Sequence, residues 1–341
     1  MKTNAGRFFE DYSVGQEIKH AVSRTVKMGE RALYHMLYPA RHALYSSDQF
    51  AQSCGLPFSP LDDLIGFHVV FGKTVPDVSL NAVANLGYAE GVFKAQVWPG
   101  DTLRSVSDVI GVKQNSNGKS GVVWVRTRGL NQHDQEVMSY VRWVMVRKRD
   151  VDAPAPATVI PDLAAVVIAD DLVLPKGLNF DNYDFDLAGE PHRMGDYQVG
   201  EIIDHVDGVT IEEAEHMMAT RLWQNTAKVH FDATARPDGT RLIYGGHVIS
   251  MARALSFNGL ANAQMIAAIN SGAHANPCLA GDTVRAWSEV LDVADTSEPS
   301  VGAIRLRLVA TRGDAGVLKT EEGKYHGDVL LDLDYWAFMP K

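Results

Sequence analysis

Three short motifs occur twice in this 341-residue chain, in the same order and about half a chain length apart. The pattern Asp-Tyr-x-Val-Gly-x-x-Ile starts at residue 11 and again at residue 196. Gly-Phe-His-Val at 66–69 corresponds to Gly-Gly-His-Val at 245–248, and the Gly-Asp-Thr turn at 100–102 corresponds to the one at 281–283. One short match would carry little weight, but several matches in a constant order indicate duplication. We therefore expect two copies of one domain.

A proline-rich segment separates the two copies. Residues 150–162 contain three prolines, and proline at this density favours an extended, non-helical chain. The sequence from there to Gly189 has only short apolar runs. We predict domains at 1–149 and 190–341, joined by a linker at 150–189 that packs across both as a strap.

Each copy has the pattern of a short helix followed by a longer apolar helix. The short helices are predicted at about 29–38 and 211–221. The second opens with Thr210 and has Glu213 three residues later, which is the spacing of a capping box. The longer apolar helices are predicted at 64–75 and 246–257.

The second part of each copy alternates apolar and polar residues, as expected for strands that have one face in the core. This alternation is clearest at 121–130 and 303–312, and each copy closes on an aromatic strand, at 140–146 and at 332–338. One long helix backed by several antiparallel strands is an α+β arrangement.

The amino-acid composition limits which cellular compartment and which binding partners we expect for this protein. The net charge is −10 and no run of Lys and Arg interrupts it, so a nucleic-acid-binding surface is not expected. No stretch approaches the roughly 18 apolar residues of a membrane helix, and the N-terminus lacks the apolar core of a signal peptide. The two cysteines, Cys54 and Cys278, predict neither a disulfide framework nor a cysteine metal site. We expect a cytoplasmic protein with reduced thiols and no membrane partner.

The paired Gly-Asp-Thr turns and the glycine motif before the second long helix resemble the MaoC-like dehydratase family. That resemblance implies the hotdog fold, in which an antiparallel sheet wraps a long central helix. Two copies in one chain imply a tandem double hotdog, covering nearly everything outside 150–189. Because hotdog proteins commonly pair, the resemblance also implies a homo-oligomer.

The stretches 224–232 and 244–249 resemble, more narrowly, the members of this family that hydrate mesaconyl-CoA (2-methylfumaryl-CoA). This implies a hydro-lyase that adds water reversibly to an acyl-CoA thioester, giving β-methylmalyl-CoA. Three alternatives stay open: an (R)-specific enoyl-CoA hydratase of fatty-acid or polyhydroxyalkanoate metabolism, a hotdog thioesterase, and a non-catalytic acyl-CoA-binding module. The enoyl-CoA hydratase alternative would favour an aspartate at position 225.

Hydratases of this family activate water with an Asp and a His five residues later. The second copy offers His230, with Asn225 five residues before it, whereas the matching loop of the first copy has no such pair, which implies that the first domain is non-catalytic and shapes the pocket. An imidazole can accept a proton from water and return one to carbon near neutral pH. Asn225 cannot transfer a proton. It can orient the water or bind the substrate carboxylate, which an aspartate would repel.

The remaining candidates surround this pair. Gly246 is expected to polarise the thioester through its N–H at the start of a helix, and Gly245, His247 and Lys228 are assigned to substrate binding. Asp232 is a reserve carboxylate, for which a loop-capping role is also open. His247 and its counterpart in the first copy are expected to pack or to line the pocket. The histidines lack metal-ligand spacing and no nucleotide-cofactor motif occurs, so neither a metal nor a cofactor is expected.

Overall fold

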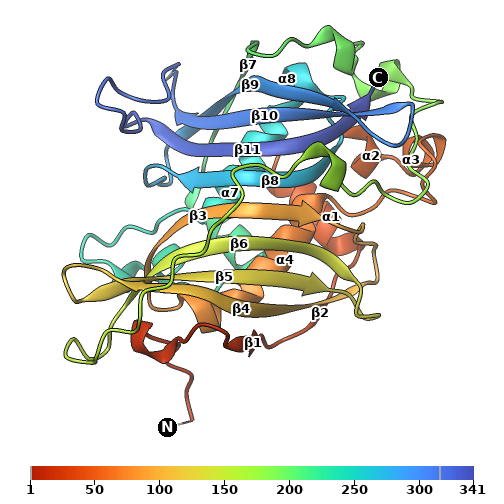
Figure 1. The fold of residues 1–341 in the computed structure, drawn as a ribbon. Coiled ribbons are helices and arrows are strands. Elements are labelled where there is room, and N and C mark those ends of the chain that lie inside the picture. The colour runs from red at the N-terminus through yellow and green to blue at the C-terminus, as the bar shows by residue number, and fades with distance from the viewer. Residues whose placement is uncertain (1, 315) are drawn as a thin grey trace.

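The computed structural model describes residues 2–314 and 316–341. In these residues the strands form one antiparallel sheet, in the order β1-β4-β5-β6-β3-β8-β11-β10-β9-β7, with β2 paired to β4 (Figure 1). The strands of the first half are β1 (Glu17–Lys19), β2 (Arg24–Thr25), β3 (Ala82–Phe93), β4 (Thr102–Gln114), β5 (Ser120–Leu130) and β6 (Glu136–Arg147). Those of the second half are β7 (Ile202–Thr210), β8 (Met265–His274), β9 (Thr283–Asp295), β10 (Val301–Arg312) and β11 (Val329–Pro340).

The strand order is symmetric about the junction of β3 and β8. These two strands pair antiparallel, with Tyr88 opposite Gly272 and Val92 opposite Ala268. Reading outward from them, β6, β5, β4 and β1 on one side correspond to β11, β10, β9 and β7 on the other. An antiparallel junction between two equivalent halves relates them by an approximate two-fold rotation. The α+β class and the tandem double hotdog are therefore confirmed.

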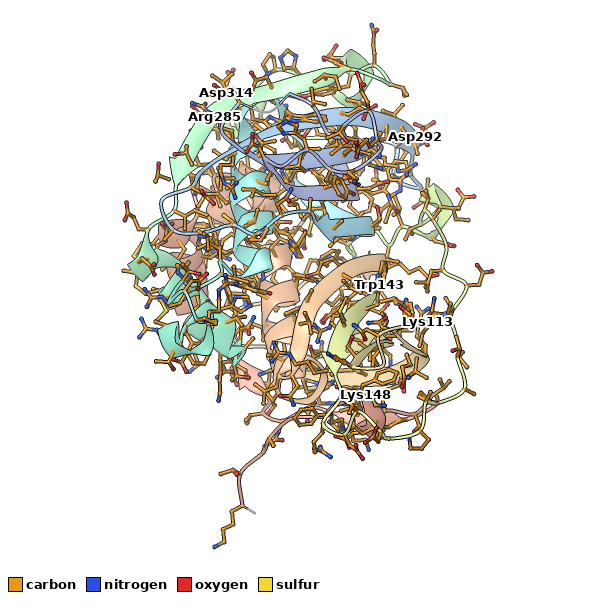
Figure 2. The ribbon with its side chains drawn as sticks, turned by 90° about the vertical axis from the view of Figure 1, so that its left-hand side faces the viewer. Lys113, Trp143, Lys148, Arg285, Asp292 and Asp314 are labelled. Carbon is orange, nitrogen blue, oxygen red and sulfur yellow. The ribbon has the colours of Figure 1, made fainter. Side chains whose placement is uncertain are left out.

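Two long helices, α4 (Asp63–Thr74) and α7 (Gly245–Leu255), lie behind the sheet in Figure 1. All residues of α4 after Asp63 are buried, as are all residues of α7 after Gly245, as expected for the central helices of two wrapped sheets. Figure 2 shows from the side how side chains fill the space between helices and sheet. The two halves share one core, because a single cluster of buried apolar residues draws on both long helices and on strands of each half.

The other helices are short. The α-helices are α1 (Met28–Leu37), α2 (Ala43–Ser46), α3 (Asp48–Ser53), α5 (Phe185–Ala188), α6 (Glu213–Leu222) and α8 (Phe257–Leu260). The single-turn elements are η1 (Phe9–Asp11), η2 (Val75–Ser79), η3 (Ala169–Asp171), η4 (Met194–Asp196), η5 (Lys228–His230) and η6 (Ala233–Ala235). No helix in residues 2–314 and 316–341 is long and apolar enough to cross a membrane.

The predicted start of α6 is wrong by two residues. Thr210 is the last residue of β7, where it pairs with Thr283 and their hydroxyl groups hydrogen-bond at 2.8 Å. Glu212 is the residue that caps the helix instead, and its N–H donates to the carboxylate of Glu215. Pairing with a neighbouring strand therefore extends β7 over the residue that local sequence assigned to the helix.

The segment 150–189 contacts both halves of the sheet. Val159 exchanges two backbone hydrogen bonds of 2.9 Å with Val112 of β4. Further along, the carbonyl of Val167 accepts a hydrogen bond from the indole of Trp336 on β11. In Figure 1 the segment runs across the front of the sheet from one half to the other.

Candidate active site

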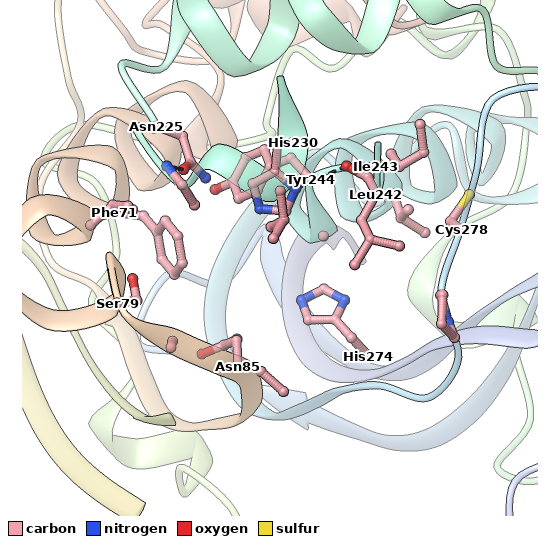
Figure 3. Close-up of a pocket in the computed structure, with 18 of the residues that line it drawn as sticks. Phe71, Ser79, Asn85, Asn225, His230, Leu242, Ile243, Tyr244, His274 and Cys278 are labelled. Carbon is pink, nitrogen blue, oxygen red and sulfur yellow. Dashed lines mark hydrogen bonds between the residues drawn. The ribbon is translucent and has the colours of Figure 1, made fainter. Parts of the chain in front are cut away.

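A cavity of about 350 Å³ lies where the two halves meet (Figure 3). The first half contributes residues from α4, η2, β3 and β6, among them Phe71, Ser79, Asn85 and Arg142. The second half contributes the loop after α6, the start of α7 and the end of β8, with Asn225, His230, Tyr244, Gly245 and His274. The volume falls within the ordinary range for small-molecule sites. The two halves thus enclose one cavity between them, and neither half forms it alone.

His230 presents a basic nitrogen to this cavity. It ends η5, and its Nδ1 lies 2.9 Å from the carbonyl oxygen of Leu242. Because a carbonyl only accepts, Nδ1 carries the proton and Nε2 keeps its lone pair. Burial lowers the pKa of His230 to about 4. The imidazole is therefore neutral near pH 7, in the form that accepts a proton from water.

Asn225 is held by the chain around it. Its side chain is buried, its N–H donates to the carbonyl of Thr220, and its Oδ1 accepts the N–H of Ala227 at 3.0 Å. The Nδ2 amide is left as the group that can donate to a ligand. Trp223, two residues earlier, is fully buried and stacks on His68 with ring centres 4.9 Å apart. Figure 3 shows Asn225 and His230 on the same wall of the cavity.

The glycine pair opens α7, with Tyr244 as its N-cap. Gly245 lines the cavity, whereas Gly246 is not among the described lining residues. A Cβ atom at Gly245 would lie 2.4 Å from the ring of His274, so glycine is needed for the close approach of strand β8. The first N–H groups of a helix have no acceptor within it, and of the two glycines it is Gly245 whose position faces the cavity.

Three of the predicted substrate-binding residues lie away from the cavity lining. Lys228 is exposed to solvent. Asp232 caps η6, where its Oδ1 accepts the N–H of Thr234 at 2.9 Å. His247 is fully buried, with its Nδ1 3.2 Å from the hydroxyl of Tyr38. These positions correspond to a surface cation, a loop cap and a packed core residue.

Sequence reasoning did not find His274, Asn85 and Arg142. His274 ends β8 and lies 3.3 Å, through Nε2, from the hydroxyl of Tyr88. Burial, and next the neighbouring imidazole of His230, lower its pKa to about 4. Strand pairing brings His274 and Asn85 to the cavity, and neither belongs to a sequence motif that could have indicated it. Arg142 offered a signal, as a lone cation in the apolar strand 140–146.

Comparisons with known proteins agree with this architecture. The family model described as mesaconyl-CoA hydratase matches residues 2–319. The chain belongs to the mesaconyl-CoA hydratase family. A mesaconyl-CoA hydratase from Cereibacter sphaeroides is 73% identical over 100% of both chains, and a beta-methylmalyl-CoA dehydratase from Chloroflexus aurantiacus is 56% identical over 100% of this chain and 99% of the relative.

Solved structures place the mesaconyl-CoA hydratase family within the MaoC-like fold. A crystal structure from Chloroflexus aurantiacus, described as a MaoC domain dehydratase, is 55% identical, covers 100% of this chain and 99% of its own, and has a TM-score of 0.98. A Mycobacterium tuberculosis protein described as a double hotdog covers 98% of this chain and 99% of its own with a TM-score of 0.76. Its 22% identity shows the fold alone. The family resemblance inferred from the repeated motifs is confirmed.

Proposed function

We propose that this protein is a hydro-lyase that reversibly hydrates mesaconyl-CoA to β-methylmalyl-CoA. The observation that carries the proposal is the 73% identity, over the full length of both chains, to a mesaconyl-CoA hydratase. The 56% identity to a beta-methylmalyl-CoA dehydratase supports the same reaction in the opposite direction. The cavity supports it chemically, because it holds a neutral imidazole beside the N-terminus of a buried helix.

The reaction follows from the position of the His230 lone pair. Nε2 takes a proton from water as the water oxygen bonds to the β-carbon of the conjugated thioester. The electrons of the carbon–carbon double bond shift toward the thioester, whose oxygen becomes negative. The imidazolium then returns a proton to the α-carbon, so that one water is added in total. The lowered pKa of His230 favours this return, because it makes the imidazolium a stronger acid.

Two further groups assist in this proposal. The N–H groups of Gly245 and Gly246 donate to the thioester oxygen as its charge develops, since Gly245 lines the cavity and Gly246 follows it in the first turn of α7. The Nδ2 amide of Asn225 orients the attacking water or the substrate carboxylate. In this proposal the 190–341 domain is catalytic, because it carries Asn225, His230 and α7, and the 1–149 domain shapes the pocket. We also propose that the protein is a homo-oligomer, because hotdog proteins commonly pair, and that it is cytoplasmic, as its composition suggests.

The test compares two conjugated thioesters. Purified protein is incubated with mesaconyl-CoA and with crotonyl-CoA, while loss of the conjugated absorbance and release of free thiol are followed. The proposal expects rapid loss of conjugation with mesaconyl-CoA and no thiol release. Preference for crotonyl-CoA would indicate an enoyl-CoA hydratase, thiol release a thioesterase, and no turnover a binding module.

The role of His230 is tested by His230→Ala, which should lower kcat by at least ~10²-fold, the lower range for a positioned acid or base. The control is His133→Ala, which removes an exposed imidazole from the turn between β5 and β6. A folded His230→Ala variant with near-native turnover would remove His230 from the mechanism.

A further inference from the structure

Arg142 is a fully buried cation in the wall of the cavity. It lies on β6, in the half of the chain opposite to His230. One terminal nitrogen donates to the hydroxyl of Thr74 at 2.7 Å, and both lie 3.4 Å from the hydroxyl of Ser79. The guanidinium carbon lies 4.4 Å from the ring centre of Phe71. All of these partners are electrically neutral.

The guanidinium of Arg142 has no anionic partner in residues 2–314 and 316–341. No carboxylate there lies within 4.0 Å of its nitrogens, and its Nε makes no hydrogen bond. Arginine stays charged at any ordinary pH, and a buried charge is costly unless an opposite charge compensates it. Arg142 is also the one Asp, Glu, Lys or Arg among the described residues that line the cavity. An anion that enters the cavity would supply the missing charge.

A second polar group without a partner lies at the same end of the cavity. Neither side-chain amide atom of Asn85 makes a hydrogen bond of ordinary geometry within the described chain, although both atoms are buried. Figure 3 shows Asn85 and Ser79 near Phe71, at the end away from Cys278, with His230 and Tyr244 between. Arg142 contacts both Ser79 and Phe71, so it belongs to this end. A guanidinium, an amide and a hydroxyl together match the donors that a carboxylate accepts.

We propose that Arg142, assisted by Asn85, binds the free carboxylate of a dicarboxylic acyl-CoA. The identification of that ligand rests on the proposed function, because in mesaconyl-CoA the carboxylate is attached to the carbon that receives the hydroxyl. The carboxylate would then occupy the end of the cavity built by the first half, while the second half supplies His230. The first half thereby selects the substrate that the second half hydrates.

The test uses two saturated ligands that cannot react. Methylsuccinyl-CoA keeps the carboxylate, and 2-methylbutyryl-CoA carries a methyl group in its place. Calorimetry on the full-length protein should show that methylsuccinyl-CoA binds roughly 10- to 100-fold more tightly, the range for hydrogen bonds to a charged group. Arg142→Met should abolish that preference by weakening methylsuccinyl-CoA alone, and Arg142→Lys should restore part of it. The control is Arg147→Met, an exposed arginine on the same strand, which should keep the preference.

Asn85→Asp provides a second test that does not remove the buried arginine. The new carboxylate would lie at the same end of the cavity, where it would repel the ligand carboxylate, so it should abolish the preference while leaving 2-methylbutyryl-CoA binding within a few-fold. A wild-type protein without the preference, or an Arg142→Met or Asn85→Asp variant that keeps it, would overturn the proposal. The proposed function is judged separately by turnover of mesaconyl-CoA. The wild-type protein could prefer methylsuccinyl-CoA and yet fail to hydrate mesaconyl-CoA. That result would overturn the proposed hydratase function but would still support carboxylate binding by Arg142.

Discussion

Replacing Gly72 with alanine should displace the loop that carries Asn225. A Cβ atom at Gly72 would lie 1.8 Å from the carbonyl oxygen of Trp223 and 3.0 Å from its carbonyl carbon. Carbon and oxygen atoms in contact are about 3.3–3.6 Å apart, so the two must separate by about 1.5 Å. Neither side moves easily, because α4 is buried along its length and the Trp223 side chain is fully buried. Asn225, two residues further on, must therefore shift with Trp223.

The Gly72→Ala variant should lose both activity and stability. A misplacement of about 1 Å can lower a rate by ~10², and we expect a fall of that size in kcat for mesaconyl-CoA. Overpacking costs about 1–3 kcal/mol, and the higher helix propensity of alanine returns only about 1 kcal/mol. Turnover is measured by loss of the conjugated absorbance, and the free energy of unfolding by urea denaturation.

Gly66→Ala is the matched control, since it makes the same substitution on the same helix. A Cβ atom there would meet only a methyl group of Val97, at 3.2 Å, and no atom of the loop that carries Asn225. This variant should keep near-native kcat. Native turnover in Gly72→Ala, or an equal loss in Gly66→Ala, would refute the argument that Gly72 positions the loop.

Two further predictions concern the substrate carboxylate and acid stability. Asn225→Asp keeps an acceptor for the Ala227 N–H but replaces the free amide donor with a second carboxylate oxygen. If this atom lies about 4 Å from the substrate carboxylate, the repulsion reaches ~4 kcal/mol at an effective dielectric near 20. The ratio of kcat/KM for mesaconyl-CoA to kcat/KM for crotonyl-CoA should therefore fall. An unchanged ratio would exclude a contact between Asn225 and the carboxylate. Burial lowers the pKa values of His68, His205 and His247 to about 3, 4 and 3, whereas in the unfolded chain they titrate near 6.5. The unfolded chain therefore binds protons that the native protein excludes, and the free energy of unfolding should fall from about pH 6.5 downward, by up to about 1.4 kcal/mol per pH unit for each histidine. Asp62 and Asp63 act in the opposite direction, because burial raises their pKa values to about 6 and 7 and the native protein therefore binds these two protons more tightly than the unfolded chain does. Urea denaturation at pH 7 and pH 5 measures the net change in the free energy of unfolding. Equal stability at the two pH values would contradict the expected loss.

Local patterns were enough to predict the architecture. The repeated motifs indicated two equivalent domains, and the long helices predicted at 64–75 and 246–257 are observed at Asp63–Thr74 and Gly245–Leu255. Each of these features depends on residues that are near neighbours in the chain. For the same reason Asn225 and His230 could be proposed together, because His230 follows Asn225 by only five positions in the chain. The start of α6 was misplaced because its competitor, the pairing of Thr210 with Thr283, is not local.

The set of residues that line the cavity depends on how the two halves pack together, which the local sequence does not specify. The pairing of β3 with β8 joins two sheets into one and brings His274 within reach of Tyr88. Arg142 and Asn85 line the same cavity as Asn225 and His230, although many residues separate the two pairs in the chain. A strand turns alternate side chains to opposite faces, so sequence can indicate that one face is buried but not which distant side chains it meets. The local chain therefore determines the helices, the strands and the His230 loop, and strand pairing across the two halves determines which groups surround that loop.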